Sequence, residues 1–138
     1  MIKGVEQHKR RLRKLRGPAM IRAVTQEIFA AASGIAIDAS LSITEGATSG
    51  AGHVASEPGS PPNADTHVLD NNIEAAITGP LKAEASSNAP YAAAQEFGSE
   101  KLNLPARPYM GPAADRGRPK AVKRVVDAVN RVVAASGA

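Results

Sequence analysis

The side chains that come closest to a chemical site are four metal-binding types near the middle of the chain, His53, Asp65, His67 and Asp70. Imidazole and carboxylate groups bind divalent metals when three or four of them converge. Their spacing matches none of the strong zinc patterns, and most of them lie in a loop rich in Gly, Ser and Pro. We therefore expect no bound metal. An enzyme with metal ligands at His53 and His67 is the weakest of three functional interpretations.

The rest of the chain carries no pattern of nucleophilic, phosphate-binding or thiol chemistry. There is no nucleophile elbow and no Ser-His-Asp context. Residues 50–52 lack the Gly-Lys-Ser/Thr that completes a phosphate-binding loop, and the absence of Cys excludes disulfides and thiol catalysis. Glu84, Glu96 and Glu100 have no partner that the sequence identifies, so we interpret them as surface carboxylates. We expect a protein that is not an enzyme and uses no cofactor.

A basic run, HKRRLRK, is the clearest electrostatic feature. Its cations cover most of a helix circumference, and such a segment binds phosphates without reading base sequence. No aromatic residue is interleaved for base stacking, so single-strand recognition is not indicated. One interpretation is a small basic nucleic-acid-binding protein; the other is a solvated helix face whose narrow apolar stripe packs on the body. The candidates for contact with DNA or an acidic partner are Lys9, Arg10, Arg11, Arg13, Lys14 and Arg16.

The net charge of +4 hides an uneven distribution along the chain. Residues 1–26 hold eight basic residues against Glu6 alone, a balance of +7. Residues 27–100 hold ten acidic residues against Lys82 alone, a balance of −9, and residues 101–138 return to +6. Such a chain can stack on copies of itself, or face a polyanion on one surface and a basic partner on another. The simpler alternative is that both ends are solvated helix faces.

Helices are predicted at both ends of the chain. Apolar residues at helical spacing predict a short amphipathic helix over residues 2–15 and a long helix over residues 18–44, separated by Gly17-Pro18. A last helix is predicted over residues 120–135, after an interruption at Arg116-Gly117-Arg118-Pro119.

A small sheet is predicted between these helices. Residues 72–78 and 81–87 alternate apolar and polar side chains around the turn Gly79-Pro80, which indicates a hairpin that needs a helix across its apolar face. A short helix over residues 91–97, ended by Gly98, follows. The predicted fold class is α+β, with a long N-terminal helix and a C-terminal helix packed on a small antiparallel β-sheet.

The 138 residues correspond to one domain. We divide it into a helical arm (1–45), a flexible loop (46–66) and the sheet with the C-terminal helix (67–138). Much of the 43% apolar fraction is Ala, so we expect a marginally stable monomer that gains burial by forming an oligomer. No segment approaches the roughly 20 apolar residues of a membrane span. We also expect no secretory signal, and therefore synthesis in the cytoplasm and no membrane partner.

Three sequence boxes occur in order between residues 61 and 113. The first is Pro61-Pro62-Asn63-Ala64-Asp65-Thr66-His67-Val68-Leu69. The second joins Tyr91-Ala92 to Glu96-Phe97-Gly98, and the third is Pro105-Ala106-Arg107-Pro108-Tyr109-Met110 followed by Pro112-Ala113. With the basic helix, the long helix and the hairpin, this order resembles the tail-completion, or head–tail joining, family of long-tailed bacteriophages and gene transfer agents. His67 stands where that family usually has Gly, and Tyr109 where it has Phe.

The resemblance implies a structural virion protein of the neck. Its copies would form a hexameric ring between the head-closure protein and the tail terminator or tail tube, and double-stranded DNA would pass through the channel. The implied location is the virion neck, after synthesis in the host bacterial cytoplasm. We expect Phe97 in the core, a positive φ at Gly98, and Arg107 paired with a carboxylate of its own or the next subunit. The interface candidates are Arg107, Tyr109, Asp65, Thr66, Tyr91 and Glu96.

Overall fold

The computed structural model describes residues 3–137 and has the predicted α+β fold. The first residue of the predicted N-terminal helix, Ile2, lies outside the described residues. In chain order the elements are the helices α1 (Val5–Leu15) and α2 (Pro18–Thr44), the short 3-10 helix η1 (Gly50–Gly52), the helix α3 (Val68–Asn71), the strands β1 (Ile73–Gly79) and β2 (Lys82–Ser87), and the helices α4 (Ala92–Phe97) and α5 (Met110–Ala135).

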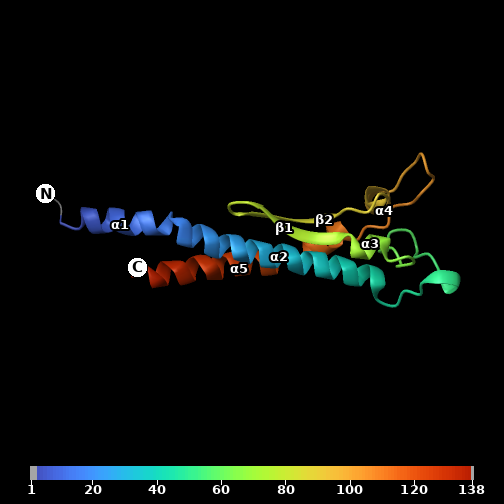
Figure 1. The fold of residues 1–138 in the computed structure, drawn as a ribbon, viewed down its shortest axis with the longest axis horizontal. Helices are drawn as coiled ribbons and strands as arrows, with labels where there is room; N and C mark the ends of the chain where they lie inside the picture. Colours follow the sequence, from blue (N-terminus) through green and yellow to red (C-terminus); the bar gives the residue numbers. More distant parts are fainter. Residues whose placement is uncertain (1–2, 138) are drawn as a thin grey trace.

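Helix α2 is the spine of an elongated molecule. It packs against α5 on one side and against both strands on the other (Figure 1). Its 27 residues span about 40 Å at 1.5 Å per residue. As Figure 1 shows, α1 therefore lies at one end of the molecule, whereas η1 and the loop after α4 lie at the other.

The hairpin is held on α2 through its turn. The strands pair antiparallel, with Ala75 opposite Ala85, and the register shifts near the turn between Ile77 and Gly79. Leu81 has a left-handed φ of 56°, and its amide donates a 2.9 Å hydrogen bond to the hydroxyl of Thr25, which is buried on α2. Ile77 and Leu81 remain exposed. Helix α2 thus covers the apolar face of the hairpin less completely near the turn than at the other end of the strands.

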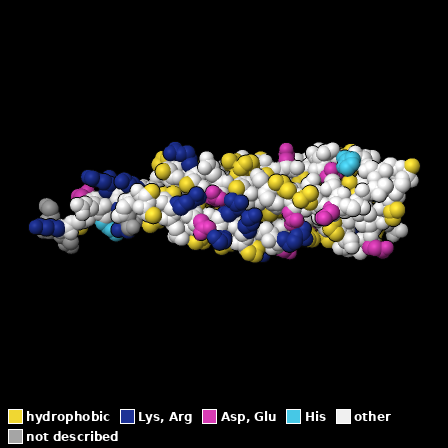
Figure 2. Space-filling view, turned by 90° about the horizontal axis from the view of Figure 1, so that it is seen from below, with side chains coloured by type: hydrophobic (Ala, Val, Ile, Leu, Met, Phe, Trp, Pro, Cys, Tyr) yellow, Lys and Arg dark blue, Asp and Glu magenta, His cyan; other side chains and the backbone are white. Residues whose placement is uncertain are grey.

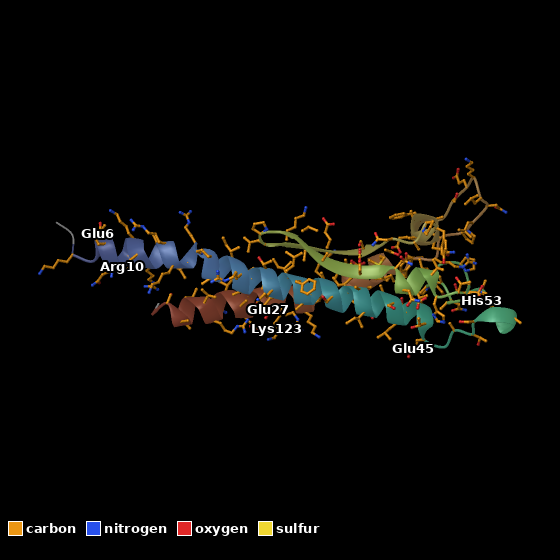
Figure 3. All side chains as sticks on the ribbon, in the orientation of Figure 1. Glu6, Arg10, Glu27, Glu45, His53 and Lys123 are labelled. Carbon is orange, nitrogen blue, oxygen red and sulfur yellow. The ribbon has the colours of Figure 1, made fainter. Side chains whose placement is uncertain are left out.

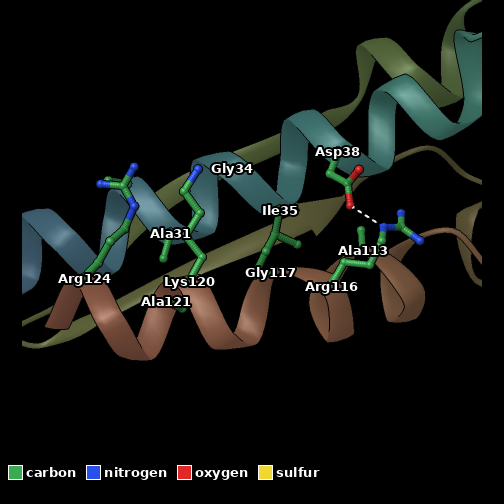
Figure 4. A pocket seen from close by; sticks show the side chains of 11 residues that line it. Ala31, Gly34, Ile35, Asp38, Ala113, Arg116, Gly117, Lys120, Ala121 and Arg124 are labelled. Carbon is green, nitrogen blue, oxygen red and sulfur yellow. Dashed lines mark hydrogen bonds and ion pairs between the residues drawn. The ribbon is translucent and has the colours of Figure 1, made fainter. Parts of the chain in front are cut away.

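Small side chains allow α5 to lie close to α2. Ala39 of α2 and Ala113 and Ala128 of α5 are fully buried. Between them, Gly117 faces Ile35 (Figure 4): a Cβ placed on Gly117 would lie 2.7 Å from Ile35 Cγ1. Alanine buries little apolar area, but these small side chains allow the two helices to approach each other closely.

Helix α5 is continuous from Met110 to Ala135, so the predicted interruption at residues 116–119 is wrong. Pro119 lies inside the helix and is exposed. A proline there removes one backbone hydrogen bond, but packing of the same helix on α2 through Ala113 and Gly117 outweighs that local cost.

Ion pairs flank the same helix contact. Arg116 Nε lies 2.8 Å from Asp38 Oδ2, and Glu27 accepts from Arg124 at 3.1 Å and from Arg131 at 3.2 Å. These side chains are partly or largely exposed, so each pair contributes little to stability. Their main consequence is that much of the positive charge of α5 is neutralised within the chain.

Two glycines of this helix pair should respond oppositely to substitution by alanine. Gly34→Ala should stabilise the protein by about 1 kcal/mol, because a Cβ there meets nothing within 4 Å and alanine favours the helix. Gly117→Ala should destabilise it by about 1–2 kcal/mol despite the same helix preference, since Ile35 must move. Urea unfolding of both variants measures the two effects. A stabilised Gly117→Ala protein would contradict the close approach of α5 and α2.

The predicted flexible loop, residues 46–66, has a defined path on the body. Ala64 N donates to Ile43 O, and Gly59 N donates to Ala106 O, both at 2.9 Å. Asn63 Nδ2 also bonds Val54 O at 2.8 Å. Ala64 is buried beside Ile43 in the core, so this loop forms one wall of it. The core cluster comprises Ala39, Ile43, Ala64, Leu69, Ala89, Ala92, Tyr109 and Ala113.

One helical stretch, Val5–Thr44, passes a length and composition test for a membrane span. The expectation that no segment approaches a span is wrong by this criterion, because the Ala and Ile residues of α2 form a long apolar helix. A core helix and a signal sequence near the N-terminus pass the same test; only 22% of the apolar window is buried, and α2 packs against α5 and the hairpin.

Candidate functional site

The second and third sequence boxes meet where α5 begins, and Glu96 joins them. Its carboxylate accepts three backbone N–H bonds: from Tyr109 at 2.8 Å and Met110 at 2.9 Å on Oε2, and from Gly111 at 2.8 Å on Oε1. The first N–H groups of a helix have no partner within the helix, and a negative charge at this end is favourable. Glu96, an expected surface carboxylate, therefore caps α5 from a separate helix.

The loop between these boxes is closed just beyond α4. Gly98 has the predicted positive φ, 75°, and Ser99 and Leu104 form a two-way bridge with bonds of 2.8 and 2.9 Å. A Cβ on Gly98 would lie 2.9 Å from Ala106 N. The residues from 99 to 104 therefore project from the body as a tight loop, visible in orange above α4 in Figure 1.

Among residues 3–137, Tyr109 is the only buried aromatic side chain, with 1% of its surface exposed. Its hydroxyl donates to Ser87 Oγ at 2.7 Å, which joins the start of α5 to the end of β2. Burial raises the pKa of Tyr109 above its ordinary value of 10.0, opposed by the bond to Ser87 and reinforced by the charge of Glu96. This interface candidate is thus a core residue.

The raised pKa predicts a specific alkaline sensitivity. Because the folded pKa lies above the unfolded one, the stabilisation from neutral Tyr109 is complete below about pH 10 and is lost as pH rises through the folded pKa. Tyr109→Phe should lower stability by about 1 kcal/mol at neutral pH, where it removes the bond to Ser87. The difference from wild type should shrink above pH 10 in urea titrations at several pH values. A constant difference would contradict the assignment.

Arg107 is tied to a carbonyl and not to a carboxylate. Its Nε donates to Ser56 O at 3.0 Å, and its backbone N donates to Gln95 O at 2.6 Å. Within residues 3–137 no salt bridge is formed by Arg107, so the expected carboxylate of the same subunit is wrong. The side chain instead fixes the loop of residues 46–66 to the segment before α5.

Asp65, Thr66 and His67 build a turn ahead of α3. Asp65 Oδ1 accepts from Gly50 N at 2.9 Å, Thr66 is exposed, and His67 has a left-handed φ of 60°. His67 thus adopts the conformation for which glycine is best suited, and its ring contacts Asp70 Oδ2 at 3.0 Å and Ser49 Oγ at 3.2 Å. A left-handed histidine costs about 1 kcal/mol relative to glycine, which these two contacts offset.

The four side chains considered as candidate metal ligands do not form one cluster within the described part of the chain. His53 Nδ1 lies 3.2 Å from Thr48 O, whereas His67 contacts Ser49 and Asp70. No group of three His, Cys, Asp or Glu residues suited to hold a metal ion occurs among residues 3–137.

Several large apolar side chains are exposed at the end that carries η1, and others are exposed along the rest of the molecule. Phe97 is 80% exposed, so its expected place in the core is wrong. In α4, Ala92 faces inward and Phe97 faces solvent. Leu102 in the projecting loop is 68% exposed and Val54 is 72% exposed. Tyr91, an interface candidate, is also exposed. The exposure of Val54, Phe97 and Leu102 was not predicted from the sequence, because hydrophobicity alone predicts burial.

The basic helix α1 has no buried residue, and its N-terminal part extends past the end of α5 (Figures 1 and 3). Its later turns lie beside that end, where Arg10, Arg11 and Lys14 line a pocket with Ser136 and Gly137. Val5 and Leu12 of its apolar stripe are exposed, which contradicts packing of the stripe on the body. Lys9 pairs with Glu6 at 3.1 Å. Among the described residues no salt bridge is formed by the other candidate cations, which are Arg10, Arg11, Arg13, Lys14 and Arg16.

The surface charge is therefore divided between the two ends. Figure 2 shows Lys and Arg side chains along α1 and the neighbouring length of the molecule, and none over the opposite end on that face. The segment of residues 45–66 at that end has three acidic residues and no Lys or Arg. This separation is a property of the tertiary structure, because α2 holds the two regions apart.

Comparison of the chain with protein-family models, curated proteins and solved structures finds no match.

Proposed function

We propose that this protein is a structural subunit of the neck of a tailed bacteriophage or gene transfer agent, a tail-completion or head–tail joining component without enzymatic activity. The observation that carries the proposal is that small apolar residues fill the interior while large apolar residues lie on the surface. The interior is built mainly from alanine, whereas Phe97, Leu102 and Val54 lie on the surface. Exposed large apolar side chains at one end are typical of a surface that is covered in an assembly.

The three boxes that carry the family resemblance also form one connected unit, which supports the proposal. Glu96 of the second box caps the helix that starts in the third, and Arg107 of the third holds the loop that ends in the first. A unit of this kind presents Phe97 and the projecting loop in a fixed orientation. It suits a subunit that must match its neighbours in shape and has no substrate to process.

In this proposal, the copies form a ring, which the resemblance implies to be hexameric, between the head-closure protein and the tail terminator or tail tube. Double-stranded DNA passes through its channel. Closed rings use heterologous contacts, in which two different surfaces of each subunit meet. Helix α1, which we call the basic arm, and the opposite end of the molecule differ in charge and shape. They provide two such surfaces.

Deletion of the gene in a producing strain tests this function. Electron microscopy should reveal DNA-filled heads separated from free tails, and a plasmid copy of the gene should restore joined particles. The Phe97→Ser, Leu102→Ser protein, which alters exposed side chains only, should fold normally and fail to restore joining. Intact particles from the deletion strain would remove the proposal.

A small basic nucleic-acid-binding protein is the second candidate, favoured by the unpaired cations of α1. It predicts that the free protein binds duplex DNA tightly and that affinity falls steeply with salt, because each neutralised phosphate releases counterions. Changing Arg10, Arg11 and Arg13 to Gln should then abolish binding. Weak binding that these substitutions leave unchanged would remove this candidate.

A further inference from the structure

We infer that the protein associates with copies of itself head to tail, with the basic arm α1 of one copy seated on the acidic end of the next. The acidic end is defined by the exposed carboxylates Glu45, Glu57 and Glu100 and by the exposed apolar side chains Val54, Phe97 and Leu102. This inference deepens the proposed assembly function and rests on it.

Most cations of the arm form no salt bridge among residues 3–137, although some of them lie beside the C-terminal end of α5. The cations of α5 are largely paired: Arg116 with Asp38, Arg124 and Arg131 with Glu27, and Lys123 with Asp127. Across the described residues, no salt bridge is formed by Arg10, Arg11, Arg13 and Lys14 of α1 or by Arg16, which follows it. The unbalanced positive charge of the molecule is therefore concentrated on one projecting helix, which also exposes Val5 and Leu12.

The opposite end of the molecule carries charge of the opposite sign and exposed apolar side chains. Residues 45–66 hold three acidic residues and no basic one, and Lys101 is the one Lys or Arg in the projecting loop. The side chains of Glu45, Glu57 and Glu100 form no hydrogen bond or salt bridge among residues 3–137. Both surfaces thus combine unpaired charge of one sign with exposed apolar groups.

The basic arm and the acidic end of one molecule are too far apart to contact each other. They lie at opposite ends of α2, a helix of 27 residues and about 40 Å (Figure 1). The arm can reach an acidic end only on another copy. Opposite charges then steer the encounter and set its direction, and the apolar groups contribute burial. Such a contact is heterologous and can repeat into a ring.

The absence of cysteine from the chain permits a direct test by cross-linking. Arg13→Cys and Glu100→Cys proteins, mixed and treated with a bismaleimide at low ionic strength, should form a cross-linked dimer of the two. High salt should suppress it. The matched control is Arg13→Cys mixed with Lys123→Cys, whose thiol lies exposed on α5 and should give no comparable product. Equal cross-linking in both mixtures would overturn the inference.

A charge exchange provides the second test, measured by analytical ultracentrifugation. Reversal of the arm (Arg10→Glu, Arg11→Glu, Arg13→Glu), or of the acidic end (Glu45→Lys, Glu57→Lys, Glu100→Lys), should weaken self-association about 100-fold. A protein with all six changes should regain it. Failure of the six-change protein to associate, with a native circular dichroism spectrum, would overturn the inference. So would a wild-type protein that stays monomeric at low salt and high concentration.

The results separate this inference from the proposed function and from DNA binding. Separated heads and tails in the deletion strain, without head-to-tail association, would preserve the neck function and overturn the inference. Head-to-tail association with intact particles from the deletion strain would do the reverse. If arm reversal abolishes binding to a short DNA duplex while reversal of the acidic end leaves self-association unchanged, the partner of the arm is DNA and the inference is overturned.

Discussion

The Gly98→Ala protein is expected to lose at least about 3 kcal/mol of unfolding free energy, because two separate costs fall on the same added atom. Gly98 has φ 75° and ψ 174°, a backbone conformation essentially restricted to glycine. The new Cβ would also lie 2.9 Å from Ala106 N and 3.0 Å from Leu104 O. Both are backbone atoms, and Leu104 is held by its bridge to Ser99, so neither can rotate away.

Such a loss is large for a domain whose total stability is typically about 5–15 kcal/mol. Urea unfolding followed by circular dichroism measures it. Gly46→Ala is the matched control: Gly46 also has a positive φ, 73°, but a Cβ there meets nothing within 4 Å. That substitution should cost only about 1 kcal/mol. Equal losses for the two variants would mean that crowding at Ala106 and Leu104 contributes nothing.

Replacement of Glu96 by Ala should destabilise the protein by about 3 kcal/mol. The carboxylate accepts bonds from the backbone N–H groups of Tyr109, Met110 and Gly111, all at 2.8 to 2.9 Å. Its removal leaves these donors without partners at the start of α5, and charge-assisted bonds of this kind contribute about 1.5–3 kcal/mol. The loss should also loosen the connection between α4 and α5.

Glu96→Gln tests whether the cap needs two acceptor oxygens. The amide keeps one acceptor oxygen for Tyr109 and Met110, loses the negative charge and turns its NH2 group toward the Gly111 N–H, so we expect most of the effect of alanine to remain. Hydrogen exchange at Tyr109, Met110 and Gly111 should accelerate in the alanine variant more than at the middle of α2. Unfolding free energies of both variants within about 0.5 kcal/mol of wild type would contradict the capping role of Glu96.

Local sequence signals account for the helices and strands of this protein. Gly17-Pro18 separates the first two helices because glycine ends a helix and proline suits the first turn of the next, and α2 begins at Pro18. Alternation of side chains predicts both strands, and Gly98 ends α4 with the positive φ that its lack of a Cβ permits. These signals act between residues a few positions apart, so they can be read without knowledge of the fold.

The packing of these elements depends on contacts between residues that are distant in the sequence. Local preference predicts a break at Pro119, yet packing against α2 carries α5 through it. Hydrophobicity places Phe97 inside, yet α4 is one short helix that directs Ala92 inward and leaves Phe97 on the surface. Glu96 reads as a surface carboxylate because its partners lie 13 to 15 residues away. The separation of charge also depends on the tertiary structure. The sequence contains the basic and acidic segments, but α2 places them at opposite ends of the molecule, because a long helix cannot fold back on itself.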